Sequence, residues 1–408
     1  MVIFKVQMWG YSHYLILISI WCGFSNCSTK LPQVSDSSNK EYLLPQYRLN
    51  PRIPLRVDSY YPPKMAKLES GNWLSYEMHV GNYFTSSISL AGVEVLTDTA
   101  SKSYLYRVIG DSLKPHFKNL TYAPDSTKMT LNPGEQGIIF FWIPLHETGP
   151  VPATLYHRIL VELQGQKLSF LTTAMEVGIT TPVVLSPPLK GLWLAAQGID
   201  PYVKSTEGHN RLLYPQFGSI RLPQRYATDW VKLGTDKKVY NGDVTKNENY
   251  YGFGAEVLAV ADGIITEIQN DVPENIPPNM TVPRTQKNIV GNYIILKLKD
   301  GRSVFYGHLQ TGSILVAPGK HVKSGEVLAH VGNTGNSTGA HLHFQVQDGT
   351  HFFDEGYPYT FGSLHRYGRA SKQQIDSMAD HGEAYSNQFE QVELKDILPV
   401  FGDIIMFK

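Results

Sequence analysis

Residues 339–346 are the stretch that most limits what this chain can fold into. They read GAHLHFQV, with histidine and apolar residues alternating from position 341. This period is typical of a β-strand, on which side chains two apart point to the same face. His341 and His343 would face one cavity, while Leu342 and Phe344 would face a core. Two imidazoles on one face suit a metal site, because one can bind the ion while the other handles a water molecule or a proton.

The composition favours an ordered, strand-rich protein of two or three domains. The chain has 408 residues, and 42% of them are hydrophobic, which is ample for packed cores. Its 36 basic and 36 acidic residues balance, and no run of lysine and arginine marks a basic arm, so nothing indicates a nucleic-acid partner. The 24 tyrosines and the frequent glycine and proline favour strands and turns over long helices.

Residues 1–28 are predicted to be a signal peptide. Lys5 gives a positive start, and the apolar run at 14–24 is short for a membrane span but suits a signal core. An uncleaved membrane anchor is the alternative. Both cysteines, Cys22 and Cys27, lie within residues 1–28. The mature chain would therefore have neither a disulfide nor a cysteine metal ligand. We expect an exported protein, periplasmic or extracellular, without a membrane span after signal removal; a lipoprotein anchored through Cys27 is a further option.

The chain beyond the signal is predicted to be mainly β. Residues 29–58 are polar and broken by prolines, as is typical of a linker. Between 59 and 180, short strand-like runs alternate with turn residues, which indicates a β-sandwich. His79, His146 and His157 are scattered through it, and we interpret them as structural or surface residues. The sandwich is most simply a binding or spacer module.

Residues 181–350 are predicted to form a second β domain, followed by a C-terminal extension at 351–408. The small-residue turn at 262–263 and the polar turn at 299–302 each lie between apolar runs, so each predicts a hairpin. One helix is expected in the extension, at 371–379.

Three sequence blocks in residues 206–350 resemble the lysostaphin/LytM-type zinc metallopeptidases. They are RYATDW at 225–230, AVADG at 259–263 together with YGHL at 306–309, and residues 322–346, which include the glycine-rich loop 332–339 and the HxH strand. The resemblance implies an antiparallel β domain of the duplicated hybrid motif type with a groove. It also implies a zinc ion and cleavage of short peptides, usually in peptidoglycan.

The family binds zinc with a histidine, an aspartate and the second histidine of HxH, and the resemblance places Asp229 and His343 in the last two roles. In most members the first histidine lies four residues before the aspartate. That position is Arg225, which cannot bind a cation. Other members carry a long insertion between these two ligands, so His209, twenty residues upstream of Asp229, is the candidate third ligand. The alternative is a surface-loop histidine and an incomplete zinc site.

The resemblance also assigns the catalytic groups. The zinc ion would polarise the scissile carbonyl and lower the pKa of its water. His341 would accept that water's proton and pass it to the leaving amine. His308 matches the family's other catalytic histidine and would orient the water or stabilise the oxyanion. His321 and His330 match no family position and are interpreted as bystanders.

The leading hypothesis is an exported zinc metalloendopeptidase that hydrolyses stem or cross-bridge peptides of peptidoglycan. The alternative is a catalytically inactive LytM-like module that binds cell wall or regulates other cell-wall hydrolases, which the displaced first histidine favours. The signal peptide and the HxH strand argue against a cytoplasmic phosphocarrier of similar β architecture. The sequence leaves open whether the sandwich serves latency, targeting or spacing. It also leaves open whether the polar insertion at 269–288 shapes specificity or is inert.

Overall fold

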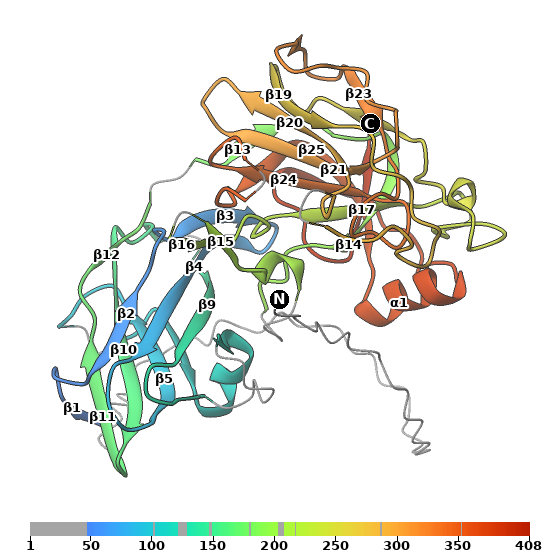
Figure 1. The fold of residues 1–408 in the computed structure, drawn as a ribbon. Coiled ribbons are helices and arrows are strands. Elements are labelled where there is room, and N and C mark those ends of the chain that lie inside the picture. Colours follow the sequence, from blue (N-terminus) through green and yellow to red (C-terminus); the bar gives the residue numbers. More distant parts are fainter. Residues whose placement is uncertain are drawn as a thin grey trace, which may run out of the picture. The chain divides into compact units, whose positions relative to one another are not determined.

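Strands dominate the computed structural model, which confirms the mainly β fold class (Figure 1). The structure describes residues 47–100, 103–120, 129–146, 149–178, 181–202, 208–216, 218–285, 288–351 and 353–408. The predicted signal peptide lies outside these residues. Among the residues that are described, no helix has the length and apolar character needed to cross a bilayer.

Two sheets with a shared hydrophobic core make up the N-terminal part. The first sheet has the order β1 (Arg48–Leu49), β11 (Gln166–Leu171), β10 (Thr154–Leu163), β5 (Ile88–Leu96) and β6 (Tyr106–Ile109), with β8 (Thr130–Leu131) beside β5 and β12 (Met175–Glu176) beside β10. The second has the order β2 (Leu55–Asp58), β4 (Gly71–Asn82), β9 (Gln136–Pro144) and β7 (Phe117–Asn119), with β3 (Lys64–Leu68) beside β4. Inward side chains of both sheets, such as Tyr76 and Ile159, share one core. The 3₁₀-helix η1 (Gly110–His116) joins β6 to β7.

Strands β1 and β2 fall within residues 29–58, for which the sequence predicted a linker. β1 pairs in parallel with β11, and β2 pairs antiparallel with β4. Pro51 and Pro54 lie between the two strands, where a missing N–H removes no ladder hydrogen bond. The described part of this segment therefore belongs to the sandwich.

An eleven-stranded sheet organises the C-terminal part of the described chain. Its order is β13 (Val183–Leu185), β25 (Tyr359–Arg369), β27 (Asp403–Phe407), β14 (Gly191–Gln197), β17 (Thr228–Lys232), β24 (Leu342–Gln347), β21 (Ser303–Leu309), β20 (Asn292–Leu298), β19 (Gly263–Gln269) and β22 (His321–Val322), with β26 (Val392–Ile397) beside β25. The smaller elements are β15 (Tyr214–Gln216) paired with β16 (Ser219–Arg221), β18 (Glu256–Leu258) paired with β23 (Val327–His330), and the 3₁₀-helices η2 (His209–Arg211) and η3 (Asn247–Asn249). Residues 351–408, predicted as an extension, thus supply three strands to the sheet that contains the HxH strand.

The local predictions for this part had mixed outcomes. The turn at 299–302 joins antiparallel β20 and β21, which confirms that hairpin. The hairpin at 262–263 was wrong, because β18 pairs with β23 while β19 pairs with β20 and β22. The Asp262 carboxylate accepts bonds from Lys323 Nζ (2.6 Å) and Ser324 N (3.0 Å), so this turn contacts the segment between β22 and β23. The predicted helix is confirmed as α1 (Lys372–His381) with Ser371 as its N-cap.

One large core lies beneath the HxH strand. Leu342 and Phe344 are fully buried in it, as their alternation with the histidines predicts. The same cluster includes Trp142 of β9, whose ring lies 5.9 Å from that of Tyr226. The sandwich and the C-terminal part are therefore joined by buried apolar contacts as well as by the chain.

The buried histidines of the sandwich predict an acid-sensitive fold. Burial lowers the pKa of His157 from 6.5 to about 3 and that of His116 to about 4. Below pH 6.5 the unfolded chain takes up protons that the folded chain does not, so stability should fall as the pH drops from 6.5 towards 4. Each histidine contributes about 1.4 kcal/mol per pH unit at full slope. Urea unfolding at pH 7.5, 6 and 5 measures this loss.

The His157→Gln variant should show a shallower pH dependence than the wild type, whereas His321→Gln, which changes an exposed side chain, should match the wild type. An unfolding free energy that stays constant between pH 7.5 and 5 would contradict the assignment of His157 and His116 as buried neutral groups.

Candidate functional site

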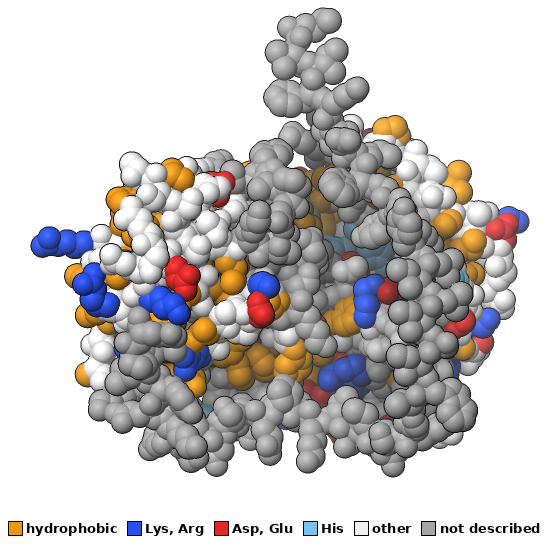
Figure 2. Space-filling view, turned by 90° about the horizontal axis from the view of Figure 1, so that it is seen from below, with side chains coloured by type: hydrophobic (Ala, Val, Ile, Leu, Met, Phe, Trp, Pro, Cys, Tyr) orange, Lys and Arg blue, Asp and Glu red, His pale blue; other side chains and the backbone are white. Residues whose placement is uncertain are grey.

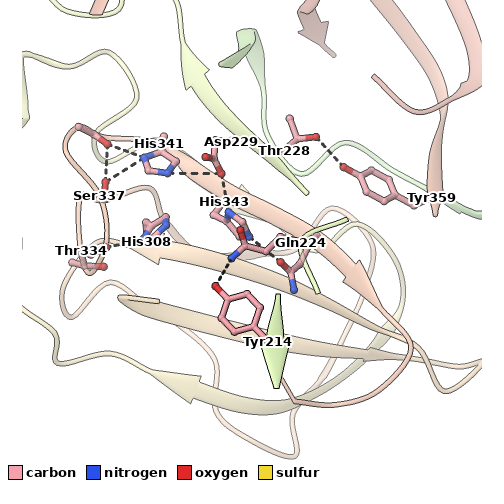
Figure 3. A network of polar contacts seen from close by, with 12 residues as sticks. Tyr214, Gln224, Thr228, Asp229, His308, Thr334, Ser337, His341, His343 and Tyr359 are labelled. Atoms are coloured by element: carbon pink, nitrogen blue, oxygen red, sulfur yellow. Dashed lines mark hydrogen bonds and ion pairs between the residues drawn. The ribbon is translucent and has the colours of Figure 1, made fainter. Parts of the chain in front are cut away.

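Four of the five side chains predicted for the site meet where β17, β24 and β21 lie side by side (Figure 3). Asp229 of β17 is the register partner of His343 of β24, and His343 is in turn opposite Gly307, directly before His308 on β21. His343 Nδ1 lies 2.7 Å from Asp229 Oδ1, and His341 Nε2 lies 3.9 Å from the same oxygen. The rings of His308 and His341 are 4.7 Å apart.

The site is only partly shielded from solvent. The side chains of Asp229 and His341 retain 15% and 13% of their exposure, and that of His343 retains 6%. Figure 2 shows histidine side chains, in pale blue, among the visible atoms of one face. A small molecule or an extended chain could reach Asp229 and His341 without unfolding of the strands.

Backbone carbonyls fix the orientation of two of the imidazoles. His308 Nδ1 lies 2.7 Å from the Thr334 carbonyl oxygen, and His341 Nδ1 lies 2.9 Å from that of Gly339. Because a carbonyl can only accept, each Nδ1 must donate, and in the neutral ring the lone pair is then on Nε2. His308 and His341 therefore present Nε2 as the atom that can accept a proton.

His343 has the opposite orientation, which Gln345 determines. The side chain of Gln345 donates from Nε2 to Gln347 Oε1 at 2.9 Å, and its Oε1 lies 2.9 Å from His343 Nε2. His343 Nε2 therefore donates, and Nδ1 faces the Asp229 carboxylate. Two lone pairs at 2.7 Å repel, so this pair needs either a proton on Nδ1 or a metal ion bound by both atoms. Nitrogen and carboxylate oxygen are the donors that zinc prefers, so these two residues fit a zinc ion.

His308 is held in a strained backbone conformation. Its φ of 59° lies in the left-handed region, which few residues other than glycine adopt. Its N–H donates to the Val290 carbonyl at 3.4 Å, and its carbonyl accepts from Gly332 N at 3.0 Å. Burial, together with the neighbouring His341 and His343, lowers the pKa of His308 well below its ordinary value, so the ring is neutral near pH 7.

Arg225 does not point into this site. Its Nη2 lies 2.5 Å from Glu77 Oε2 on β4 and 2.7 Å from Glu355 Oε1, and its Nε donates to Glu355 Oε1 at 2.9 Å. All three side chains are buried. The position at which the family resemblance predicts a histidine therefore holds a buried ion pair between the two parts of the chain.

His209 remains a predicted ligand. Its backbone belongs to η2, and its side chain lies outside the described side chains. The adjacent Asn210 donates to the carbonyl of Gly198 at 3.4 Å, and Gly198 follows Gln197, the register partner of Asp229. The η2 backbone therefore lies beside the β14 end of the site. Among the side chains that are described, no group of three or more His, Cys, Asp or Glu is placed to hold a metal.

The sequence reasoning did not single out Gln345. A signal was available, because His341, His343, Gln345 and Gln347 follow one another at two-residue intervals and share a strand face. The same alternation continues beyond the histidines through two buried amides. Thr334 and Ser337 could not be singled out, because they act through a loop conformation that no short pattern specifies.

Residues 250–355 match Peptidase family M23. The chain carries a peptidase family M23 domain. The match includes His308, His341 and His343 and begins after Asp229, so the matched segment contains the HxH strand. The match covers two of the three sequence blocks, because 225–230 lies outside it, and it confirms the family resemblance inferred from the sequence.

The M23 domain is similar to the DD-carboxypeptidase/endopeptidase Mpg of Neisseria meningitidis serogroup B (strain MC58) and of Neisseria gonorrhoeae (strain ATCC 700825 / FA 1090). Each is 34% identical over 94 residues, which is 23% of this chain and 17% of the relative. The matched segment therefore spans less than a fifth of these curated relatives.

Solved structures of peptidases are also similar to parts of the chain. The catalytic domain of the antimicrobial peptidase lysostaphin from Staphylococcus simulans is 26% identical, with 33% of this chain and 73% of that chain covered and a TM-score of 0.19. The M23 metalloprotease pseudoalterin is 15% identical, with 55% and 99% covered and a TM-score of 0.26.

Removal of the Arg225 guanidinium should strongly destabilise the fold. In Arg225→Ala, Glu77 and Glu355 would stay buried without their main cationic partner. Breaking a buried pair in this way costs about 3–5 kcal/mol, measurable as a loss of unfolding free energy in urea. The exposed Arg52→Ala is the control and should change it by less than about 0.5 kcal/mol. A loss of similar size in both variants would show that the Arg225 ion pairs contribute little.

Proposed function

We propose that the M23 domain is a zinc-dependent endopeptidase that hydrolyses peptide bonds in peptidoglycan stem or cross-bridge peptides. The observation that carries this proposal is the Asp229–His343 pair, two metal-type donors 2.7 Å apart whose facing lone pairs need either a shared proton or a metal ion. His341 and His308 lie beside it with Nε2 able to accept protons. Membership of the domain in a peptidase family supports the reaction class, and the cell-wall substrate follows from the family resemblance.

The zinc ligands would be Asp229 Oδ1, His343 Nδ1 and His209. A zinc ion held there supplies Lewis acidity that polarises a peptide carbonyl and activates water. His341 lies close to these ligands, with Nε2 3.9 Å from Asp229 Oδ1, and it would take the proton of the water and deliver it to the leaving amine. His308, neutral and fixed by Thr334, would orient the water or bind the developing oxyanion.

We also propose that the protein is exported to the periplasm or the cell exterior. The support is the apolar run at 14–24 after Lys5. Peptidoglycan lies outside the cytoplasm, so this location matches the proposed substrate.

An inactive M23 module that binds cell wall or regulates other hydrolases is the second candidate. One observation favours it: Arg225, at the position where the family resemblance expects a ligand, is held in buried ion pairs instead. This candidate predicts that the purified protein retains no zinc and leaves peptidoglycan intact.

The metal content of four variants tests the zinc site. We expect one zinc ion per chain in the wild type, loss of zinc in His343→Ala and His209→Ala, and retained zinc without peptidoglycan digestion in His341→Ala. The exposed His321→Ala should keep both zinc and activity. If only His343→Ala loses zinc, the third ligand is not His209. A wild type without zinc favours the inactive module.

Gln345 should tune the zinc affinity through His343. Replacing it by leucine removes the acceptor that fixes His343 Nε2, and loss of such a supporting bond typically lowers metal affinity by about 10–100-fold. Gln345→Glu keeps an acceptor and should retain more of the affinity. Competition with a zinc chelator measures both variants. An unchanged affinity in Gln345→Leu would show that strand pairing alone orients His343.

A further inference from the structure

The described residues of the insertion between β19 and β20, 270–285 and 288–291, lie beside the glycine-rich loop 332–339. This loop carries the contacts of both predicted catalytic histidines. We propose that this insertion fixes the conformation of the glycine-rich loop by hydrogen bonds, a role that we call the brace. Glu274 and Asn275 would thereby be positioning residues for His308 and His341. The roles of the two histidines rest on the proposed function, whereas the brace itself rests on the contacts below.

The first end of the insertion bonds the loop through two adjacent side chains. Glu274 accepts from Asn333 N at 2.6 Å through Oε2 and from Thr311 N at 2.8 Å through Oε1. Asn275 is 1% exposed. Its Nδ2 donates both hydrogens to loop carbonyls, to Gly335 O at 2.9 Å and to the residue two further on, Ser337, at 3.0 Å. One buried amide thus fixes two points of the loop.

The second end of the insertion contacts the same loop through the backbone. Asn336 N donates to the Ile289 carbonyl at 2.8 Å. Asn292 N, directly after the insertion, donates to Thr334 Oγ1 at 2.9 Å. A Cβ atom at Gly335 would lie 2.2 Å from Gly291 N, so the two backbones approach as closely as only glycine permits. Both ends of the insertion therefore contact the loop and hold it in place.

The loop residues that the insertion holds are also those that orient the two histidines. The Thr334 carbonyl accepts from His308 Nδ1 at 2.7 Å. Ser337 Oγ lies 3.2 Å from His341 Nδ1. The same hydroxyl donates to the Gly339 carbonyl at 3.0 Å, and this carbonyl is the other contact of His341 Nδ1. A shift of the loop would therefore move both imidazoles.

The strained backbone of His308 explains why a brace is needed. A φ of 59° persists in a histidine only when the surroundings over-determine it. The Val290 carbonyl, within the insertion, accepts the His308 N–H, so the insertion holds the His308 backbone directly as well. Displacement of catalytic groups by about 1 Å can cost about 100-fold in rate.

The substitution Asn275→Asp tests the brace, because it keeps the size of the side chain and replaces both donors by an acceptor. We expect kcat on a soluble peptidoglycan peptide to fall by about 10–100-fold, with KM changed less than about 3-fold and zinc content unchanged. Asn279→Asp is the matched control: it makes the same change on an exposed residue of the same insertion and should leave both constants unchanged.

A second readout does not depend on activity. Histidine ¹⁵N NMR of the metal-free chain, assigned with His308→Gln and His341→Gln, reports which ring nitrogen carries the proton. We expect Nδ1–H for both rings in the wild type and a mixture of tautomers in Asn275→Asp. If Asn275→Asp does not fold, Glu274→Gln, which weakens the Asn333 and Thr311 contacts, should give the same changes to a smaller degree.

The outcomes separate the brace from the proposed function. A wild type that cleaves no peptide rejects the peptidase, and the NMR comparison still decides the brace. Wild-type ring spectra and wild-type kcat in Asn275→Asp would overturn the brace. A uniform loss of zinc and folded protein in both Asn275→Asp and Glu274→Gln would also overturn it in favour of a purely structural role.

Discussion

The pairing of β17 with β24 is the constraint on which the site depends. It sets Asp229 opposite His343, and a slip of one residue would turn every side chain of one strand to the other face. Trp230 and Phe344, the next residues along each strand, are fully buried in the core. The packing of these two aromatic rings therefore specifies the register, and the register places the two donors of the candidate metal site.

Hydrogen bonds from neighbouring residues fix the orientation of each imidazole in the site. His343 takes its orientation from Gln345, His308 from the Thr334 carbonyl, and His341 from Gly339 and Ser337. Each imidazole is thus held by a neighbour that takes no part in the proposed reaction. Supporting bonds of this kind fix the protonated nitrogen of each ring, which decides whether the ring offers a base or a ligand.

The sequence predicted those parts of the structure that neighbouring residues determine, and it failed where residues far apart in the chain come together. Alternation predicted the HxH strand and its two faces, and the helix expected at 371–379 is present as α1. The hairpin at 262–263 was wrong because Asp262 binds Lys323 and Ser324, some sixty residues further along the chain. The partners of Arg225 were equally out of reach, since Glu77 and Glu355 lie far away on either side of it.

The ion pairs of Arg225 have a consequence for how this protein can be divided. Glu77 belongs to the sandwich, whereas Arg225 and Glu355 belong to the C-terminal part, and Trp142 of the sandwich packs on Tyr226 beside them. A cut between the two parts would expose to water the Arg225–Glu355 pair and the Tyr226 ring, which are buried in the whole chain. The break between the sandwich and the C-terminal part is therefore not a boundary of independent folding, and an excised C-terminal part would carry an exposed, aggregation-prone face.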